Sequence, residues 1–314
     1  MKPFRLVAPC KDYLWGGNKL REYGKISDSD IIAESWELSC HPDGESVIAD
    51  GEDAGRTLTA FLAEHPEAAG TNCTRFERFP TLIKLIDAKD NLSVQVHPDD
   101  AYALAHEGEY GKTELWYIVE ASPGAELIYG FGGNITKKEF RRAIEKNTLL
   151  EKVNRVPVKK GDVFFIEAGT LHAIGKGILI AEIQQNSNTT YRVYDYGRLG
   201  ADGKPRALHI EKALDVTRLA PVTPAQDRPK NSSGWQLLGF CDYFFASCME
   251  QEDFCIIGVD DTSFVHLLIL EGDAVLKTEN VEIPLKKGTS VFVPAGTGAC
   301  RIYGKCKFIN TSIR

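Results

Sequence analysis

Two polar side chains, Gln95 and His97, lie two positions apart in the strand-like segment SVQVHP. Because side chains alternate along a strand, both would point to one face while the intervening valines point to the other. Glu114 follows at the start of a hydrophobic segment, and His172 ends a glycine-containing segment further along the chain. One or two imidazoles plus a carboxylate on neighbouring strands suit zinc with an open coordination position, or a non-haem Fe(II) centre. The remaining histidines are interpreted as core or surface residues: His41, His65, His106, His209 and His266.

A gapless internal repeat places His172 in a structural context. The segment KKGDVFFIEAGTLH at 159–172 aligns with KKGTSVFVPAGTGA at 286–299, and the two share KKG, a phenylalanine and AGT. A similar hydrophobic strand precedes each copy, at 115–120 and 265–270. Two related barrels are the simplest explanation of this repeat. The second copy has Ala299 where the first has His172, so we expect the C-terminal barrel to be structural.

The pattern of apolar residues predicts a mainly β protein with a few helices. Strands are expected at 46–49, 92–97, 115–120, 126–129, 163–167, 178–184, 191–195, 236–240, 244–249, 254–259, 264–270, 274–277 and 290–293. Helices that begin near capping or turn residues are expected at 57–64, 98–106, 136–146 and 209–218. The spacing of Gly161, Gly169 and His172 resembles the second motif of cupin barrels. We predict two cupin-like β-barrels of the jelly-roll type, with helices inserted in or flanking the N-terminal one.

A linker divides the chain into two predicted domains. Residues 218–234 combine three prolines with polar and small residues, a composition typical of linkers. We therefore expect a domain at 1–220, which carries the candidate metal ligands, and a C-terminal cupin domain at 221–314 that has lost them.

Composition excludes several classes of function. The chain of 314 residues is long enough for two domains, and its net charge of −7 disfavours binding to nucleic acid or to an anionic membrane surface. Its apolar runs are far shorter than the roughly 20 residues that cross a bilayer. The N-terminus has no sustained apolar segment of a secretory signal, and eight single cysteines fit a reduced, cytoplasmic protein. We expect neither a membrane nor a nucleic-acid partner.

Four motifs in order resemble the signature of type I mannose-6-phosphate isomerases. They are QVHPDD at 95–100, GKTE at 111–114, AGTLHA at 168–173 and NTTYRVYDYGR at 188–198. The resemblance extends back to YLWGG at 13–17 and ESWE at 34–37, so it covers nearly the whole chain. The chain is short for this family and is similar to its compact bacterial branch. Glu167 replaces the proline usual in the cupin motif, whereas Pro294 occupies that place in the second copy.

The resemblance implies the ligands of a metal ion. It makes His97, Glu114 and His172 the ligands of one zinc ion per chain, with Gln95 a substrate-binding residue or a fourth ligand. The implied reaction is the interconversion of mannose 6-phosphate and fructose 6-phosphate through a cis-enediol. A sugar phosphate is therefore the expected partner, and we expect the chain to be a monomer or a weak homo-oligomer.

The resemblance also points to two cationic residues. Arg192 corresponds to the arginine treated as catalytic in this family, and a guanidinium cannot accept a proton at ordinary pH. We therefore expect Arg192 to bind the substrate and to stabilise a developing enediolate. Lys112, two residues before Glu114, is expected to approach the substrate's phosphate or to assist proton transfer.

Two other functions fit the same residues. Two histidines and one carboxylate also form the facial triad of Fe(II) dioxygenases. A non-catalytic sugar-binding cupin would keep the fold without the chemistry, because function belongs to the site and not to the fold.

Overall fold

The computed structural model describes residues 1–200, 203–223 and 231–314. The chain divides into two compact units that interleave in sequence. Over the described residues, the first unit contains Met1–Asp12, Asn18–Leu85 and the chain from 231 onward. The second contains Tyr13–Gly17 and the chain from 86 to 223. Residues 224–230 of the predicted linker lie outside the described residues.

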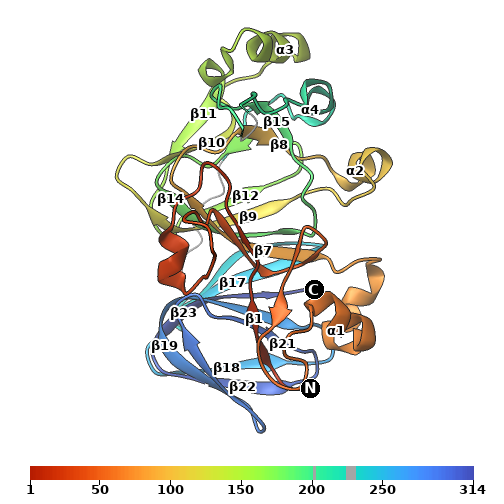
Figure 1. Ribbon diagram of the computed structural model, residues 1–314, viewed down its shortest axis with the longest axis vertical. Coiled ribbons are helices and arrows are strands. Elements are labelled where there is room, and N and C mark those ends of the chain that lie inside the picture. Colours follow the sequence, from red (N-terminus) through yellow and green to blue (C-terminus); the bar gives the residue numbers. More distant parts are fainter. Residues whose placement is uncertain (201–202, 224–230) are drawn as a thin grey trace. The chain divides into compact units, whose positions relative to one another are not determined.

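Antiparallel strands dominate the first unit (Figure 1). Its strands are β1 (Phe4–Val7), β2 (Cys10–Lys11), β3 (Glu34–Leu38), β4 (Cys40–His41), β5 (Gly44–Glu45), β6 (Val47–Ile48), β16 (Trp235–Cys241), β17 (Phe244–Gln251), β18 (Phe254–Val259), β19 (Val265–Lys277), β20 (Glu282–Lys286), β21 (Ser290–Val293), β22 (Gly298–Tyr303) and β23 (Cys306–Ser312). One sheet follows the order β16-β17-β23-β19-β21-β1-β6, and β18, β20 and β22 pair beside this path. Strand β1 pairs with both β21 and β6. This pairing groups N-terminal residues with the C-terminal strands, whereas the sequence-based division at 220 separates them.

A bulge joins two predicted strands into one. The segments expected at 264–270 and 274–277 form the single strand β19. Its pairing with β23 shifts register between Ile269 and Glu271, and Gly272 has a φ of 97°. A side chain would be strained at this φ, so glycine lets the strand bend. The predicted break is therefore wrong, because the strand continues through the bend while its partners change from β21 and β23 to β20 and β22.

The second unit holds the remaining strands and most of the helices. Its elements are β8 (Val94–Val96), α2 (Asp100–His106), β9 (Glu114–Ala121), β10 (Glu126–Phe131), α3 (Lys137–Glu145), β11 (Val153–Pro157), β12 (Val163–Ile166), β13 (His172–Ala173), β14 (Ile178–Gln185), β15 (Tyr191–Tyr194) and α4 (Ile210–Val216). Strand β7 (Thr81–Ala88) runs from the first unit into the second. One sheet has the order β11-β10-β13-β8-β15, and β12, β9 and β14 are consecutive neighbours in another.

All four predicted helices are present, with bounds that differ by one or two residues at most ends. Helix α1 (Leu58–Glu64) begins after Thr57, whose side chain accepts a hydrogen bond from the Ala60 amide. Helix α3 begins with a capping box, in which the side chains of Thr136 and Glu139 each accept a hydrogen bond from the backbone N–H of the other residue. These caps satisfy amides that a helix start leaves without partners.

Alternation along the strands builds the core of the second unit. Helices α3 and α4 pack against one face of the sheet that contains β8, β13 and β15 (Figure 1). The strand residues in this core are Val94, Val96, Leu171, Ala173, Tyr191 and Val193, and they meet Phe140 and Leu214 of the helices. The residues between them therefore point to the opposite face of the sheet.

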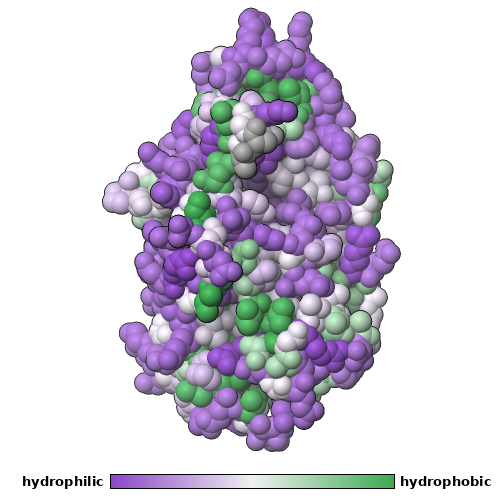
Figure 2. Space-filling model, in the orientation of Figure 1, coloured by the Kyte–Doolittle hydropathy of each residue, from purple (hydrophilic) through white to green (hydrophobic). Residues whose placement is uncertain are grey.

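The architecture confirms the predicted mainly β, cupin-like fold with a few helices. Over the described residues the strand orders are open paths, so the sheets do not close into rings. Figure 2 shows a face on which hydrophilic side chains predominate and apolar ones are scattered. Within the described parts of the chain, no helix is both long and apolar enough to span a membrane.

Candidate metal centre

Three adjacent strands place polar side chains in one row. On these strands Arg192 lies opposite Gln95, and Gln95 lies opposite His172. Directly paired residues of antiparallel strands point to the same side of a sheet. Because the flanking residues face the helical core, this row lies on the other face of the sheet. The predicted substrate-binding residues and one predicted ligand are thus neighbours.

His97 and Glu114 reach the same place from strand ends. His97 follows β8, and the chain then enters α2, whose first turn is capped by Asp99 accepting a hydrogen bond from the Tyr102 amide at 2.9 Å. Glu114 is the first residue of β9 and is paired with Ile166 on one side and Gln184 on the other. Glu114 therefore lies in a strand, whereas His97 lies in the short connection between β8 and α2.

The predicted ligands converge in the structure. Ligand atoms of His97, Glu114 and His172 all lie within 4.8 Å of one another, and all three residues are buried. His97 Nε2 is 3.2 Å from Glu114 Oε1, and His172 Nε2 is 3.8 Å from Glu114 Oε2. Gln95 Nε2 lies 3.5 Å from His172 Nε2. The four side chains predicted from two short motifs and a repeat therefore share one location.

Main-chain carbonyls set the orientation of both imidazoles. His97 Nδ1 lies 2.8 Å from the carbonyl oxygen of Thr189, and His172 Nδ1 lies 2.8 Å from that of Thr170. A carbonyl only accepts, so each Nδ1 carries the hydrogen and donates it. Each Nε2 is then left with a free lone pair directed at Glu114, which is the tautomer a metal ligand needs.

The protonation states of this group suit a cation. Burial, followed by the charge of Lys112, lowers the pKa of His97 to about 3, and burial also lowers the pKa of His172. Burial alone would raise the pKa of Glu114. The positive charge of Lys112 and the contacts with both histidines outweigh burial and hold that pKa well below its usual range. Neutral imidazoles beside an ionised carboxylate are the forms that bind metals.

Buried polar atoms with unmet hydrogen-bonding capacity indicate what the group accommodates. Over the described residues, His97 Nε2 and both carboxylate oxygens of Glu114 are buried and make no hydrogen bond of acceptable geometry, although Lys112 Nζ is 2.6 Å from Glu114 Oε1. Such atoms are costly in a folded protein unless something compensates them. A divalent cation would satisfy all three at once. Two imidazoles, a carboxylate and a nearby amide are a donor set for zinc, and equally for Fe(II).

Both predicted cationic residues lie beside this group. Lys112 Nζ is 2.6 Å from Glu114 Oε1, and the lysine is buried. The Arg192 guanidinium is half-buried and donates to Ser93 Oγ at 3.2 Å through Nε. Ser93 Oγ in turn lies 3.4 Å from Gln95 Oε1. Burial, together with the charge of Arg206, lowers the pKa of Arg192.

Glu182 is a functional candidate that the sequence interpretation missed. It lies opposite Trp116 in the β14–β9 pairing, and its Oε2 accepts the Trp116 indole N–H at 2.9 Å. The same indole meets the His172 ring edge-on at 5.3 Å. Glu182 lies two residues before Gln184, the residue paired with Glu114, so it shares their face. A carboxylate within the apolar run at 178–184 was the available signal.

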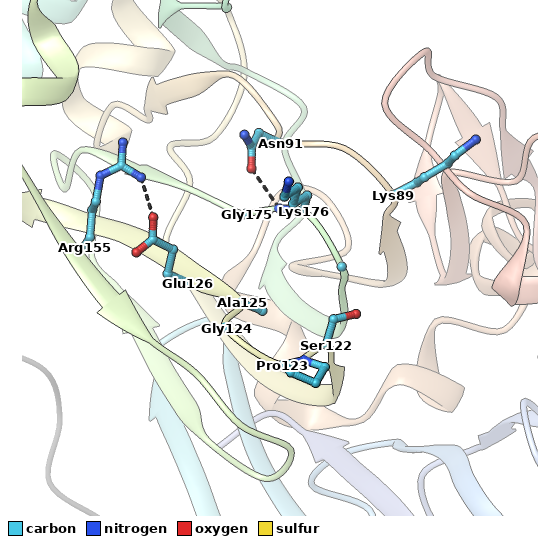
Figure 3. A pocket seen from close by; sticks show the side chains of 11 residues that line it. Lys89, Asn91, Ser122, Pro123, Gly124, Ala125, Glu126, Arg155, Gly175 and Lys176 are labelled. Carbon is cyan, nitrogen blue, oxygen red and sulfur yellow. Dashed lines mark hydrogen bonds and ion pairs between the residues drawn. The ribbon is translucent and has the colours of Figure 1, made fainter.

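A separate surface pocket lies away from the metal group (Figure 3). It has a volume of about 450 Å³ and is lined by Lys89, Asn91, Arg155 and residues 122–126 and 175–177. Arg155 pairs with Glu126, and Asn91 accepts the Lys176 backbone N–H at 2.8 Å. These segments precede β8 and follow β9 and β13, whereas the ligand candidates lie at the opposite ends of those strands. None of the predicted site residues lines this pocket.

Hydrogen bonds define the register of the internal repeat. Gly161 N donates to Ile118 O at 2.8 Å, and Gly288 N donates to Ile269 O at 2.7 Å. Strand β12 likewise corresponds to β21, residue for residue, as the sequence alignment predicts. Ile118 thus corresponds to Ile269, a residue-by-residue register that the similarity of 115–120 and 265–270 did not specify.

This register shows which residue of the second copy takes the place of each candidate metal ligand. Val265 takes the place of Glu114, since the two occupy equivalent pairs with β21 and β12. Gly169 N donates to His97 O at 2.8 Å, and Gly296 N donates to Asp260 O at 2.7 Å, so Asp260 takes the place of His97. With Ala299 in place of His172, the set reads Asp260, Val265 and Ala299. Two of its three members offer no ligand atom.

Comparison with known proteins agrees with this geometry. The sequence matches the phosphomannose isomerase type I catalytic domain over residues 3–117 and the mannose-6-phosphate isomerase cupin domain over 241–313. A mannose-6-phosphate isomerase of Streptococcus mutans is 47% identical over 71% of both chains. Mannose-6-phosphate isomerase ManA of Bacillus subtilis is 38% identical over 98% of both chains.

Solved structures give the same result. The crystal structure of the mannose 6-phosphate isomerase from Bacillus subtilis superposes with a TM-score of 0.93 at 37% identity, covering 99% of both chains. Phosphomannose isomerase from Salmonella typhimurium, at 18% identity and a TM-score of 0.83, shares the fold. The chain belongs to the type I phosphomannose isomerase family.

Proposed function

We propose that this chain is a zinc-dependent aldose–ketose isomerase that interconverts mannose 6-phosphate and fructose 6-phosphate through a cis-enediol. The observation that supports this most is the convergence of His97, Glu114 and His172 in metal-binding protonation states, on motifs shared with the family. The substrate follows from the mannose-6-phosphate isomerases that this chain resembles, and the choice of metal follows from the donor set.

His97, Glu114 and His172 would hold one zinc ion, with Gln95 on the open side as a substrate-binding residue or a fourth ligand. These residues would hold the ion where it would supply Lewis-acid polarisation of the sugar's oxygens. Gln95 already lies within 3.5 Å of a ligand atom, so its amide can orient a sugar hydroxyl beside the group. Its position between His172 and Arg192 in the sheet favours this role.

Isomerisation of the aldose to the ketose moves one proton from C2 to C1 and a second proton from the hydroxyl on C2 to the oxygen on C1. The histidines are poor bases for this step, because each Nε2 lone pair would be engaged. Glu182 and Lys112 are ionisable groups near the ligands that would not themselves hold the metal, and we assign proton transfer to one of them. Arg192 would place a fixed cation beside the oxygen on which negative charge develops, and Lys112 would also attract the phosphate.

The C-terminal copy would serve a structural role. Residues 1–220 would carry catalysis, and 221–314 would form a cupin domain that has lost its ligands. The replacements Val265 and Ala299 support this proposal, because neither side chain can ligate.

Incubation with mannose 6-phosphate in deuterated water, followed by proton NMR, tests the proposal. We expect fructose 6-phosphate to form with solvent deuterium at C1, because the proton carried through an enediol exchanges with water at the base. Product without deuterium would contradict the enediol, and unchanged substrate would contradict the isomerase. Consumption of dissolved oxygen would instead identify an Fe(II) dioxygenase, the alternative that shares this donor set.

A further inference from the structure

The loop between β14 and β15 carries the carbonyl that orients His97. Thr189 O accepts the His97 Nδ1–H at 2.8 Å, and Thr189 lies two residues before β15 begins at Tyr191. A loop carbonyl can orient a metal ligand only if the loop itself has a fixed conformation. The contacts that fix residues 187–189 therefore affect the orientation of His97.

One carboxylate oxygen, Oε2 of Glu109, accepts hydrogen bonds from three residues of this loop. Glu109 Oε2 accepts from Thr189 Oγ1 at 3.1 Å, from the Asn188 backbone N–H at 3.3 Å and from Ser187 Oγ at 3.4 Å. Ser187 Oγ also accepts the Thr189 backbone N–H at 3.2 Å. Hydrogen bonds to an ionised acceptor are stronger than those between neutral groups. Glu109 thus anchors three consecutive residues, the last of which provides the carbonyl.

A second carboxylate holds the other end of the loop. Glu107 Oε1 accepts from Tyr191 OH at 2.7 Å and from Lys212 Nζ at 2.6 Å. Glu107 and Glu109 belong to the connection between α2 and β9, which continues into Lys112 and Glu114. This connection therefore ties the support of one candidate ligand to the strand that carries another.

We propose that Glu109 is a positioning residue for the metal site, acting through Thr189 on His97. Its carboxylate holds the loop so that the Thr189 carbonyl accepts a hydrogen bond from the His97 Nδ1–H. The Nε2 of His97 then points at Glu114. The inference rests on the metal site of the proposed function and not on the isomerase reaction. Outer partners of this kind typically change metal affinity by 10- to 100-fold when they are removed.

Zinc affinity measured by competition with a chromophoric chelator tests the proposal. We expect Glu109→Ala to weaken zinc binding by about 10- to 100-fold. Glu109→Gln should lose less, because the amide oxygen can still accept part of the loop's hydrogen bonds. Thr189→Val, which removes one donor and keeps the backbone carbonyl, should weaken binding in the same direction by a smaller factor. The matched control is Glu211→Ala, which removes an exposed carboxylate paired with Arg141 and should leave zinc affinity unchanged.

Nitrogen-15 NMR of the metal-free protein provides a readout that needs neither zinc nor substrate. The wild-type protein should show His97 with its hydrogen on Nδ1, and Glu109→Ala should show tautomer averaging and faster exchange of that hydrogen. A folded Glu109→Ala protein with wild-type zinc affinity and an unchanged His97 signal would overturn the proposal. If Glu109→Ala does not fold, the same comparison on Glu109→Gln and Thr189→Val decides. A wild-type chain that binds no zinc would refute the proposed function, and the His97 signal would still decide the role of Glu109.

Discussion

Replacing Lys112 by methionine removes the ammonium group beside Glu114 and keeps most of the side-chain stem. Lys112 is 4% exposed and Glu114 is 0% exposed, and their charged atoms are 2.6 Å apart. Removing one partner of a buried ion pair leaves an uncompensated charge and typically costs about 3–5 kcal/mol. In the metal-free protein we therefore expect Lys112→Met to lower the free energy of unfolding by about this amount.

Zinc should rescue most of that loss, because a dication beside Glu114 compensates the same carboxylate. We expect the destabilisation in saturating zinc to fall to about 1 kcal/mol, the scale of a weakly coupled pair. Urea unfolding of the metal-free and zinc-loaded proteins, followed by two independent probes, measures both values, since a chain of two units need not unfold in one step.

Lys159→Met is the matched control, because Lys159 pairs with Asp162 at 2.5 Å but its side chain is 79% exposed. It should change stability by less than about 1 kcal/mol with or without zinc. An equal loss of unfolding free energy for Lys112→Met with and without zinc, or no loss without zinc, would refute the claim that Lys112 compensates the charge of Glu114 in the metal-free protein. The activity of zinc-loaded Lys112→Met separates roles: a purely structural lysine predicts normal turnover, and our proposal predicts a strong decrease.

Further predictions concern the substrate, acid stability and metal content. Arg192→Ala should lower kcat by roughly 10²-fold with zinc content nearly normal; a raised KM with unchanged kcat would indicate phosphate binding instead, and normal kinetics would exclude both roles. Metal-free protein should lose stability as pH falls from 6.5 toward about 3. In this pH range His97 binds a proton in the unfolded chain but stays neutral in the folded one. The slope is at most about 1.4 kcal/mol per pH unit for this group, and His97→Gln should flatten it in urea titrations at stepped pH. Elemental analysis should find one zinc per chain, lost in His172→Ala and kept in Asp260→Asn, whereas a second zinc would contradict the proposed loss of ligands from the C-terminal copy.

Part of the candidate site could be predicted from simple patterns. Alternation along a strand put Gln95 and His97 on one face, and the internal repeat marked His172 as the residue that the second copy lacks. The complete ligand set with Glu114 came from the resemblance to the family, and the structure places these side chains together. The helices were predictable for the same reason, since their caps are local.

Residues inside fully buried strands could not be assigned in this way. Every residue of β14 is buried, so no alternation distinguished Glu182 from its neighbours, and only its pairing with Trp116 shows which way it points. The first six residues of β9 and of β19 are likewise all buried, so no alternation shows which of them are equivalent in the two copies. The contacts of Glu109 are also hidden from the sequence, because it meets residues about 80 positions away through loops. Strands β1 and β21 are even further apart in the sequence, and no local pattern predicts that they pair.

The central claim is that a zinc ion held by His97, Glu114 and His172 is required to isomerise mannose 6-phosphate. The most direct measurement is a coupled assay for fructose 6-phosphate formation by the purified chain, before chelation, after chelation and after addition of stoichiometric zinc. The account predicts activity that disappears with the metal and returns when one equivalent of zinc is bound, while His172→Ala neither retains zinc nor recovers. Full activity in protein shown to be free of metal, or recovery by Fe(II) and not by zinc, would contradict it.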